Sequence, residues 1–309
     1  MRSRTLAERD PFAPVRYRYP DVTPLYSSRS EFQTIEVYDN PFFGRILVLD
    51  GVVQLTQRDE FVYHEMLAHV PLHSHPAPKR VLVIGGGDGG TLREVLKHPT
   101  VERAVLCELD QMVIEVARKF FPALAEPFDS PRVEILIADG AKFMRETSER
   151  FDAILVDSTD PVGPAQTLSS KQFFETARQA LTPDGLFAMQ SESLHYHVDF
   201  VNYMQRTLRE VFPHTGLYGA AIATYAGNWW TFSMGSKSAI AQAPVRPAVP
   251  GTRLYCDEVH RSAFIPAKVL ACFTEAAAQA KVHCEAPASP NASAPSPRRS
   301  SRPARPVRV

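Results

Sequence analysis

Residues 81–90 read V-L-V-I-G-G-G-D-G-G, and the helix-like segment T-L-R-E-V-L-K-H follows directly. A short apolar run rich in β-branched residues, followed by glycines, predicts a buried strand, a tight turn and the start of a helix. Glycines such as Gly85 and Gly87 let the backbone approach a ligand closely, and the amides of a helix N-terminus favour negative charge or lone pairs. Asp88 would repel a phosphate or a carboxylate in this turn, so we expect a cationic or amine-bearing ligand. By itself, such a turn also occurs as a plain connection between a strand and a helix.

The composition is that of a soluble globular protein. The chain has 309 residues, of which 44% are hydrophobic and 22% charged, and its formal net charge is zero. A neutral chain gives no indication of nucleic acid or an anionic membrane as a partner. The first ten residues lack the apolar core of a signal peptide, and no segment is apolar over the length that spans a bilayer. We therefore expect a cytoplasmic protein.

Strand-like and helix-like segments alternate from Lys79 onward, which predicts an α/β fold with a parallel-rich sheet covered by helices on both faces. The expected strands are 80–84, 103–108, 132–137, 152–156, 185–190, 216–223 and 229–235. The expected helices are 89–98, 110–120, 140–147, 169–181 and 197–211.

A small antiparallel β unit is expected before this sheet, at about 15–57, because short strand patterns there are separated by P-F-F-G and D-G turns. Residues 1–30 are polar, and their beginning is expected to be irregular. A short helix should follow at about 61–70 and end at Pro71. The predicted domains are an N-terminal β-strand domain at 1–62, a catalytic domain at 63–283 and a disordered tail at 284–309, rich in Ala, Pro, Ser and Arg.

Four consecutive predicted strands each end in an acidic residue. These are Asp88 in the glycine turn, Glu108, Asp139, and Asp157 with Asp160 three residues later. Because open α/β sheets bind ligands at the carboxyl ends of their strands, these acids should share one cleft. An acid at the end of the second strand, as Glu108 is, commonly accepts hydrogen bonds from ribose hydroxyls. Each acid alone could also be a helix cap or a turn residue.

Several carboxylates around one cleft raise each other's pKa unless a cation sits among them, so a polycationic ligand is expected. Asp157, at the tip of an apolar strand, could take a proton from an ammonium group and free an amine for attack. Tyr63 and His64 are candidates for the same cleft, with packing and capping as the alternative.

Aromatic residues near the late G-N turn, Tyr225, Trp229 and Trp230, could hold the methylene stem of a diamine or belong to the core. His195 and His197 have no third ligand nearby, so no metal is expected.

The motifs resemble those of the polyamine aminopropyltransferases, and of the spermidine synthases among them. The resemblance covers about 25–237, and more loosely extends to 265. It rests on L-D-G-V-V-Q-L-T-Q-R-D-E-F-V-Y-H-E-M at 49–66, the glycine turn with its helix at 81–98, A-D-G-A-K-F at 138–143 and V-D-S-T-D-P-V-G-P-A at 156–165.

The resemblance implies a small N-terminal β domain, a Rossmann-like, methyltransferase-type catalytic domain and a homodimer or homotetramer. It implies transfer of the aminopropyl group of decarboxylated S-adenosylmethionine, a co-substrate, to putrescine, giving spermidine and 5'-methylthioadenosine with no cofactor and no metal. Contacts to the nucleoside part of the donor are expected from the glycine turn at Gly85 and Gly87 and, by the resemblance, from Gln33, Glu108, Asp139, Gly140 and Pro164. Contacts to the polyamine or the aminopropyl arm are expected from Tyr63, His64, Asp88, Asp157, Asp160 and Tyr225, with Asp157 as the catalytic base.

Some motifs depart from the family. The run Y-A-G-N-W-W at 225–230 lacks the proline and the further glycine that often follow the tyrosine, and R-L-Y-C-D-E-V-H at 253–260 differs from the usual R-Y-Y-N-P-E-I-H. Because the first run borders the acceptor, agmatine, cadaverine or spermidine remain possible acceptors in place of putrescine. Two other classes of protein also stay open, an amine N-methyltransferase that uses intact S-adenosylmethionine and a non-catalytic polyamine-binding protein. Asp88 opposes the first class through its charge, and the retained Asp157 and Asp160 oppose the second.

Overall fold

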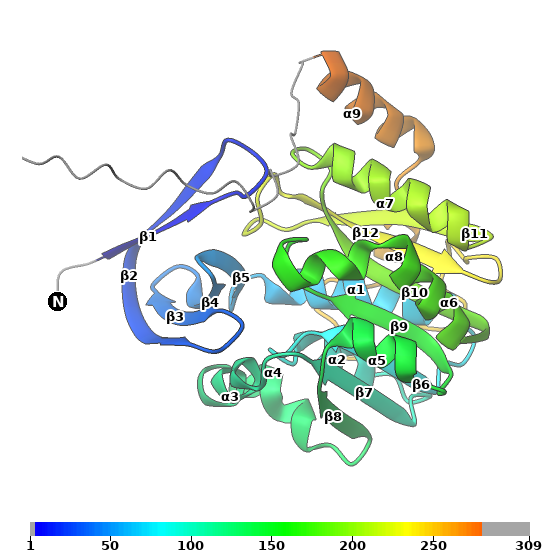
Figure 1. Cartoon of the computed structure of the whole chain (residues 1–309), viewed down its shortest axis with the longest axis horizontal. Helices are drawn as coiled ribbons and strands as arrows, with labels where there is room; N and C mark the ends of the chain where they lie inside the picture. Colours follow the sequence, from blue (N-terminus) through cyan, green and yellow to red (C-terminus); the bar gives the residue numbers. More distant parts are fainter. Residues whose placement is uncertain (1–3, 280–309) are drawn as a thin grey trace, which may run out of the picture.

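The computed structural model describes residues 4–279, except for the side chain of Pro164, and this part of the chain forms two sheets (Figure 1). The N-terminal sheet is antiparallel and has its strands in chain order. Its strands are β1 Arg4–Arg9, β2 Arg16–Arg29, β3 Thr34–Asn40, β4 Gly44–Leu49 and β5 Val52–Thr56. The expected small β unit is therefore present. The tail predicted at 284–309 lies outside the described residues.

The expectation that the chain begins irregularly is wrong for β1, which pairs with β2 along its length. Leu6 is the one buried residue of β1, and it packs with Tyr19 and Val22. Asp10, directly after the strand, is buried as well. A strand with a single buried apolar side chain has no alternating pattern that a sequence could reveal.

The larger sheet has seven strands in the order β11-β12-β10-β9-β6-β7-β8. These are β6 Arg80–Gly85, β7 Arg103–Glu108, β8 Val133–Ile137, β9 Phe151–Asp157, β10 Leu181–Ser193, β11 His214–Ala221 and β12 Trp229–Ser236. The run from β8 to β10 is parallel, and β12 and β11 are antiparallel. This mixed, parallel-rich sheet with its helices confirms the predicted fold class. Because β6 pairs with β7 on one side and with β9 on the other, the sheet has its topological switch point there, where ligands of such folds bind.

Each central strand is buried on both faces, so its residues alternate between two cores. In β6, Val81 and Val83 pack into the core beneath α1 and α2, whereas Leu82 and Ile84 pack into the core beneath α5, α6 and α7. The helices are α1 Glu60–Ser74, α2 Gly90–Leu96, α3 Gln111–Phe120, α4 Pro122–Ala125, α5 Gly140–Glu146, α6 Lys171–Ala180, α7 Val198–Val211, α8 Asp257–Ala263 and α9 Ala267–Gln279. Of these, the sequence does not predict α4, α8 and α9.

Helix α1 does not end at Pro71 but continues to Ser74. An interior proline removes one backbone hydrogen bond and costs about 3 kcal/mol. Every residue from Val62 to Ser74 is buried, so packing on all sides holds the helix together beyond the proline.

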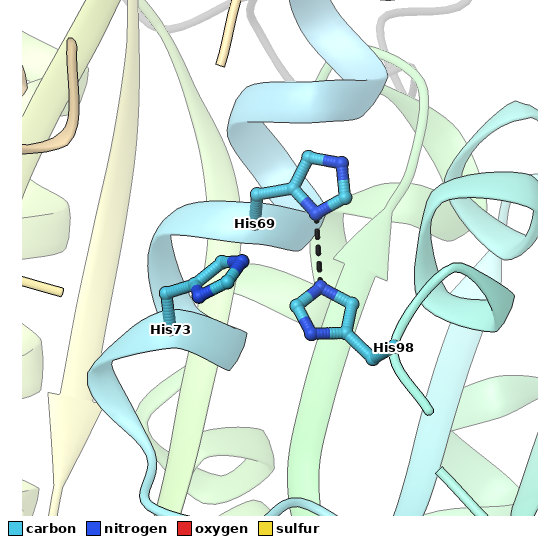
Figure 2. Close-up of side chains that lie close together, drawn as sticks. All are labelled: His69, His73 and His98. Carbon is cyan, nitrogen blue, oxygen red and sulfur yellow. Dashed lines mark hydrogen bonds between the residues drawn. The ribbon is translucent and has the colours of Figure 1, made fainter. Parts of the chain in front are cut away.

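A cluster of buried histidines joins α1 to the end of α2 (Figure 2). Glu94 accepts a hydrogen bond of 2.9 Å from Nε2 of His69, and Nδ1 of His69 lies 2.9 Å from Nε2 of His98. Arg246 donates to Nδ1 of His98 at 3.2 Å, so Nε2 of His98 must carry the proton that His69 accepts. Neither ring nitrogen of His73 has a hydrogen-bond partner among the described residues.

The N-terminal sheet packs against the larger domain through α3 and α4. Ile35, Val37 and Leu47 share a core with Val116 and Phe121. This contact places β3 and β4 beside the carboxyl ends of the parallel strands. Across residues 4–279, we find no helix with the length and apolar character needed to cross a membrane.

Candidate active site

The glycine turn brings β6 and β9 close together at their carboxyl ends. Gly85 and Gly86 have φ of 75° and 69°, and the amide of Gly86 donates a 2.8 Å hydrogen bond to the carbonyl of Asp157. A Cβ atom on Gly85 would lie 2.2 Å from that carbonyl oxygen. Only glycine fits here, and the turn fixes the position of Asp157.

Asp157 is half-buried and lies between two hydroxyl groups. Tyr63 donates to Oδ1 at 2.9 Å and Thr91 donates to Oδ2 at 2.6 Å. Burial raises the pKa of Asp157 to about 6, with a further contribution from the charge of Asp88, and the two hydroxyl groups oppose this rise. Asp157 is therefore a stronger base than an ordinary aspartate and is still mostly ionised at neutral pH.

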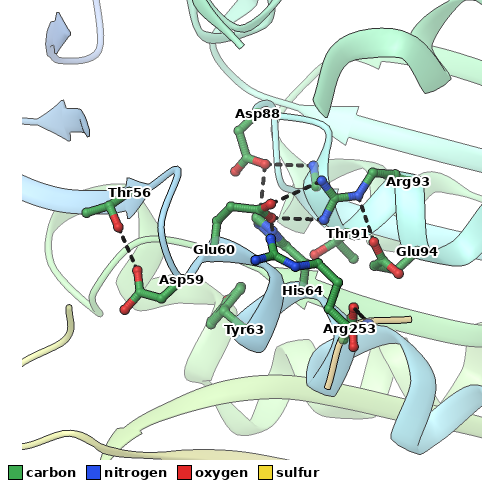
Figure 3. Close-up of polar contacts among 12 residues, drawn as sticks. Thr56, Asp59, Glu60, Tyr63, His64, Asp88, Thr91, Arg93, Glu94 and Arg253 are labelled. Carbon is green, nitrogen blue, oxygen red and sulfur yellow. Dashed lines mark hydrogen bonds and ion pairs between the residues drawn. The ribbon is translucent and has the colours of Figure 1, made fainter. Parts of the chain in front are cut away.

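Asp88 begins a chain of alternating charges that runs away from the cavity (Figure 3). Nε2 of His64 lies 3.3 Å from Oδ1 of Asp88, and Nδ1 of His64 lies 2.7 Å from Glu60. Arg93 pairs with Glu60 at 2.9 Å and with Glu94 at 2.7 Å. Although burial alone would lower the pKa of His64, Asp88 and Glu60 raise it well above its usual value. His64 is thus an imidazolium that offsets part of the charge of Asp88.

Glu108 lies at the opposite side of the glycine turn. It accepts hydrogen bonds from the amides of Gly87 at 3.0 Å and Asp110 at 2.9 Å, and burial raises its pKa to about 7. A Cβ atom on Gly87 would lie 2.8 Å from Oε2 of Glu108. Gln33, from the N-terminal domain, donates to Asp110 at 3.0 Å. Carboxylate and amide groups at this end can bind the hydroxyl groups of a nucleoside.

Carboxyl groups also line the end beyond Asp157. Burial and the charge of Glu192 raise the pKa of Asp160 well above its usual value, and the two carboxyl groups share a hydrogen bond. Glu8, from β1, lines the same cavity, and burial raises its pKa to about 7. Tyr225 packs against Tyr63 and Trp230, with ring centroids 5.7 and 4.6 Å apart. The arrangement is an aromatic wall with acids at its end, which suits an amine with an apolar stem.

One cavity of about 250 Å³ contains nearly all of the predicted site residues. Those that line it are Gln33, Tyr63, His64, Gly85, Gly87, Asp88, Glu108, Asp139, Gly140, Asp157, Asp160 and Tyr225. Pro164 falls in the 3-10 helix η2 Gly163–Ser169, next in sequence to the lining residue Ala165, and its side chain is outside the described part.

The structure decides two questions that the sequence left open. Tyr63 and His64 face the cavity and are not merely core residues. Trp230 lines the cavity, whereas Trp229 packs against His195 and Phe273.

Several lining residues were missed in the sequence. Glu192 lies at the carboxyl end of β10, the fifth parallel strand, and the rule that found the other acids would have found it. Glu8 and Asp10 had no signal, because the start of the chain reads as irregular. His197, considered only as a metal ligand, lines the cavity as well.

The ligand atoms of His64, Asp88 and Asp157 lie within 4.8 Å of one another, as do those of His69, His73 and His98. Both ring nitrogens of His64 already contact carboxylates, and both of His69 are hydrogen-bonded. A metal at either place would have to displace these contacts.

Similar proteins share both parts of the chain. The family model described as the spermine/spermidine synthase domain matches residues 60–244, and the spermidine synthase tetramerisation domain matches residues 22–57. Polyamine aminopropyltransferase 1 of Aquifex aeolicus (strain VF5) is 50% identical over 266 residues, which are 86% of this chain and 95% of that protein. The spermidine synthase of Dictyostelium discoideum is 44% identical over 245 residues, 78% of this chain and 86% of that protein. A crystal structure of a spermidine synthase in complex with the transition state analogue AdoDATO has a TM-score of 0.82 at 37% identity, over 89% of this chain and 96% of that chain.

Proposed function

Because the chain belongs to the spermine/spermidine synthase family of polyamine aminopropyltransferases, we propose that its acceptor is putrescine and that Asp157 is the general base. The observation that carries the proposal is the half-buried carboxylate of Asp157, which lines the cavity and whose pKa is raised to about 6. The donor in this proposal is decarboxylated S-adenosylmethionine, and the products are spermidine and 5'-methylthioadenosine.

The chemical step is a direct displacement. Asp157 takes a proton from one ammonium group of putrescine. The neutral amine then attacks the methylene carbon of the aminopropyl group that is bonded to the sulfonium. The carbon–sulfur bond breaks with its electron pair going to sulfur, which becomes the neutral thioether of methylthioadenosine. The new secondary amine carries the positive charge, and the proton on Asp157 leaves to solvent. Raising the pKa of Asp157 from 3.8 to about 6 lowers the energy of the proton transfer by about 3 kcal/mol.

The donor occupies the end of the cavity between Glu108 and Asp88 in this proposal. Glu108 accepts hydrogen bonds from the ribose hydroxyls, with Gln33, Asp139, Gly140 and Pro164 around the nucleoside. Asp88 receives the amine of the aminopropyl arm. A donor that retained its carboxylate would meet Asp88 as a like charge, although His64 offsets part of that repulsion.

The acceptor occupies the end that contains Tyr63, Tyr225 and Asp160. Its methylene stem lies along the tyrosines, and its far ammonium pairs with Asp160 and Glu192. Burial and Glu192 raise the pKa of Asp160 well above its usual value, although the charge of His197 opposes this rise, so binding of the ammonium should release a proton from Asp160.

The proposal includes a homo-oligomer and needs no metal. The matched tetramerisation domain runs from within β2 to the end of β5. Leu25 on β2 is 41% exposed, and Phe42 in the turn between β3 and β4 is 60% exposed. Exposed large apolar side chains are typical of protein contact surfaces. Light scattering of the purified protein tests this part of the proposal, and a monomer would contradict it.

The decisive experiment supplies the purified protein with putrescine and either decarboxylated or intact S-adenosylmethionine, with and without a chelator. The nucleoside product is identified by mass spectrometry. We expect methylthioadenosine from the decarboxylated donor only, with no effect of the chelator. S-adenosylhomocysteine from the intact donor would instead show a methyltransferase, and faster turnover of agmatine, cadaverine or spermidine than of putrescine would overturn the proposed acceptor.

A further inference from the structure

The turn between β1 and β2 reaches from the N-terminal sheet to the wall of the cavity. Glu8, Asp10 and Pro11 of this segment line the cavity together with residues of the catalytic domain. Tyr17 and Tyr19 of β2 also reach the catalytic domain, since their hydroxyl groups bond to Gly227 and to the carbonyl of Thr224. The hairpin is therefore attached to the loop that carries Tyr225.

Asp10 organises this turn and also reaches across it. Its Oδ1 accepts hydrogen bonds from the amides of Phe12 at 2.9 Å and Ala13 at 2.6 Å. Both carboxylate oxygens of Asp10 lie 3.1 Å from Nε2 of His197, which is 187 residues away in the sequence. Burial by itself would raise the pKa of Asp10, but the hydrogen bond from His197 and those from the amides lower it.

His197 is held between two carboxylates. Its Nδ1 lies 3.1 Å from Glu192 and its Nε2 contacts Asp10, and the three side chains are at most 3% exposed. Burial would lower the pKa of His197, but these two partners raise it to about 10. His197 is therefore an imidazolium that links the N-terminal turn to the catalytic domain.

The backbone conformation of Glu192 and its contact with His197 together set the direction of its side chain. It has φ of 67°, which is unusual for a residue other than glycine, and it lies in a register shift of β10 between Gln190 and Ser193. Bulges of this kind redirect side chains beside functional sites. Its carboxyl group meets Asp160, where the acceptor's far ammonium is placed in the proposed function.

We propose that Asp10 is a positioning residue for the acceptor: it holds His197, and His197 in turn holds Glu192 against Asp160 at the far end of the cavity. The turn between β1 and β2 thus completes the acceptor site without touching the donor. This inference rests on the proposed function, because it assigns the Asp160 end to the acceptor.

Asp10→Asn tests the inference, because the amide oxygen of asparagine can still accept from Phe12 and Ala13 while the charge facing His197 is lost. We expect the KM for putrescine to rise about tenfold, with the KM for decarboxylated S-adenosylmethionine and the Kd for methylthioadenosine within about twofold of wild type. His197→Gln should give a similar split, and the double variant should be no worse than His197→Gln alone, because Asp10 acts through His197. Glu36→Gln, a change of the same chemistry on β3 outside the cavity, is the matched control and should leave both KM values unchanged.

Calorimetry of putrescine binding to the complex with methylthioadenosine gives a readout that needs no turnover. A putrescine Kd unchanged in folded Asp10→Asn would overturn the inference, as would equal losses for both substrates or additive effects in the double variant. If wild type bound putrescine without turning it over, the proposed function would fall, and the Kd of the Asp10→Asn variant would still decide the role of Asp10.

Discussion

Tyr63 donates a 2.9 Å hydrogen bond to Oδ1 of Asp157, although 94 residues separate them. Tyr63 belongs to α1, which enters the larger domain directly after the N-terminal sheet, whereas Asp157 ends β9. Thr91 binds the other carboxylate oxygen from the first turn of α2. Three separate elements thus fix the orientation of one carboxylate, which also lines the cavity.

Replacing Asp157 by asparagine should remove the base and keep the shape of the side chain. We expect kcat to fall by about 10² to 10⁴, with the Kd for methylthioadenosine within about twofold of wild type, because the base acts on the amine. Steady-state kinetics and calorimetry measure the two effects. Asp152 lies at the other end of the same strand and accepts hydrogen bonds from the backbone amides of Lys79 and Arg80. The control variant Asp152→Asn should therefore keep its activity. A kcat within about tenfold of wild type for Asp157→Asn would exclude the assigned role.

The pH profile should depend on Thr91. Asp157 must be ionised to act, so kcat/KM for putrescine should fall as the pH drops through about 6, where Asp157 titrates. Thr91→Val removes a donor that stabilises the ionised form, and the acid limb should move upward by about one pH unit. Thr91→Ser keeps the hydroxyl and should leave the limb in place. An acid limb at the same pH in Thr91→Val would contradict the interpretation.

Replacement by alanine should change the free energy of unfolding differently at two glycines that have similar φ angles. Gly51 has φ of 83° and no atom within 4 Å of the point where a Cβ atom would lie, whereas Gly85 has φ of 75° and would place Cβ 2.2 Å from the carbonyl oxygen of Asp157. Gly51→Ala should lose only the conformational term, about 1 kcal/mol in the free energy of unfolding. Gly85→Ala should lose at least about 3 kcal/mol, or all activity through displacement of Asp157. Denaturant titrations compare the two, and equal losses would show that the clash relaxes freely.

The unpartnered His73 should be replaceable with a gain in stability. His73→Phe keeps the stacked contact with Tyr255 and removes two buried ring nitrogens that have no partner among the described residues, so the free energy of unfolding should rise by about 1 kcal/mol. Burial and the charge of Arg246 lower the pKa of His73 to about 3 from 6.5, so between these values the unfolded chain binds the extra proton. Wild type therefore loses stability as the pH falls below 6.5, and the gain should be larger at about pH 5.5 than at about pH 8.

His69→Phe is the opposite case on the same helix. It breaks the contacts with both Glu94 and His98. Glu94 keeps its ion pairs with Arg93 and Lys97, but the buried Nε2 proton of His98 loses its acceptor, so the variant should destabilise the protein by about 1 to 3 kcal/mol. Thermal and chemical unfolding at both pH values would measure the stability of His73→Phe and His69→Phe relative to wild type. A loss of stability in both variants would show that the size of the phenyl ring matters more than the polar groups.

The acids at the carboxyl ends of the strands could be predicted because a parallel sheet brings consecutive strand ends to one edge. Asp88, Glu108, Asp139 and Asp157 could therefore be found from the strand pattern alone, and Glu192 could have been found in the same way. Gln33 was reachable only through the resemblance, since its place depends on how the N-terminal sheet packs on α3 and α4.

Contacts between the domains were not visible in the sequence. Asp10 and His197 are far apart along the chain, and an acid in a polar N-terminal segment does not indicate a buried ion pair. The prediction of a helix end at Pro71 is wrong for a related reason. Local propensity ends a helix at proline, but α1 is buried along its length, and tertiary packing decides where it stops.

The hydrogen bonds from Arg246 through His98 and His69 to Glu94 all point in one direction. Each imidazole must therefore adopt the tautomer that its neighbours require, and a change at one position leaves a donor facing a donor or an acceptor facing an acceptor. We therefore expect these four residues to change together in evolution. Relatives should either keep the whole set or replace several members together, and an isolated exchange should be rare unless a compensating change accompanies it.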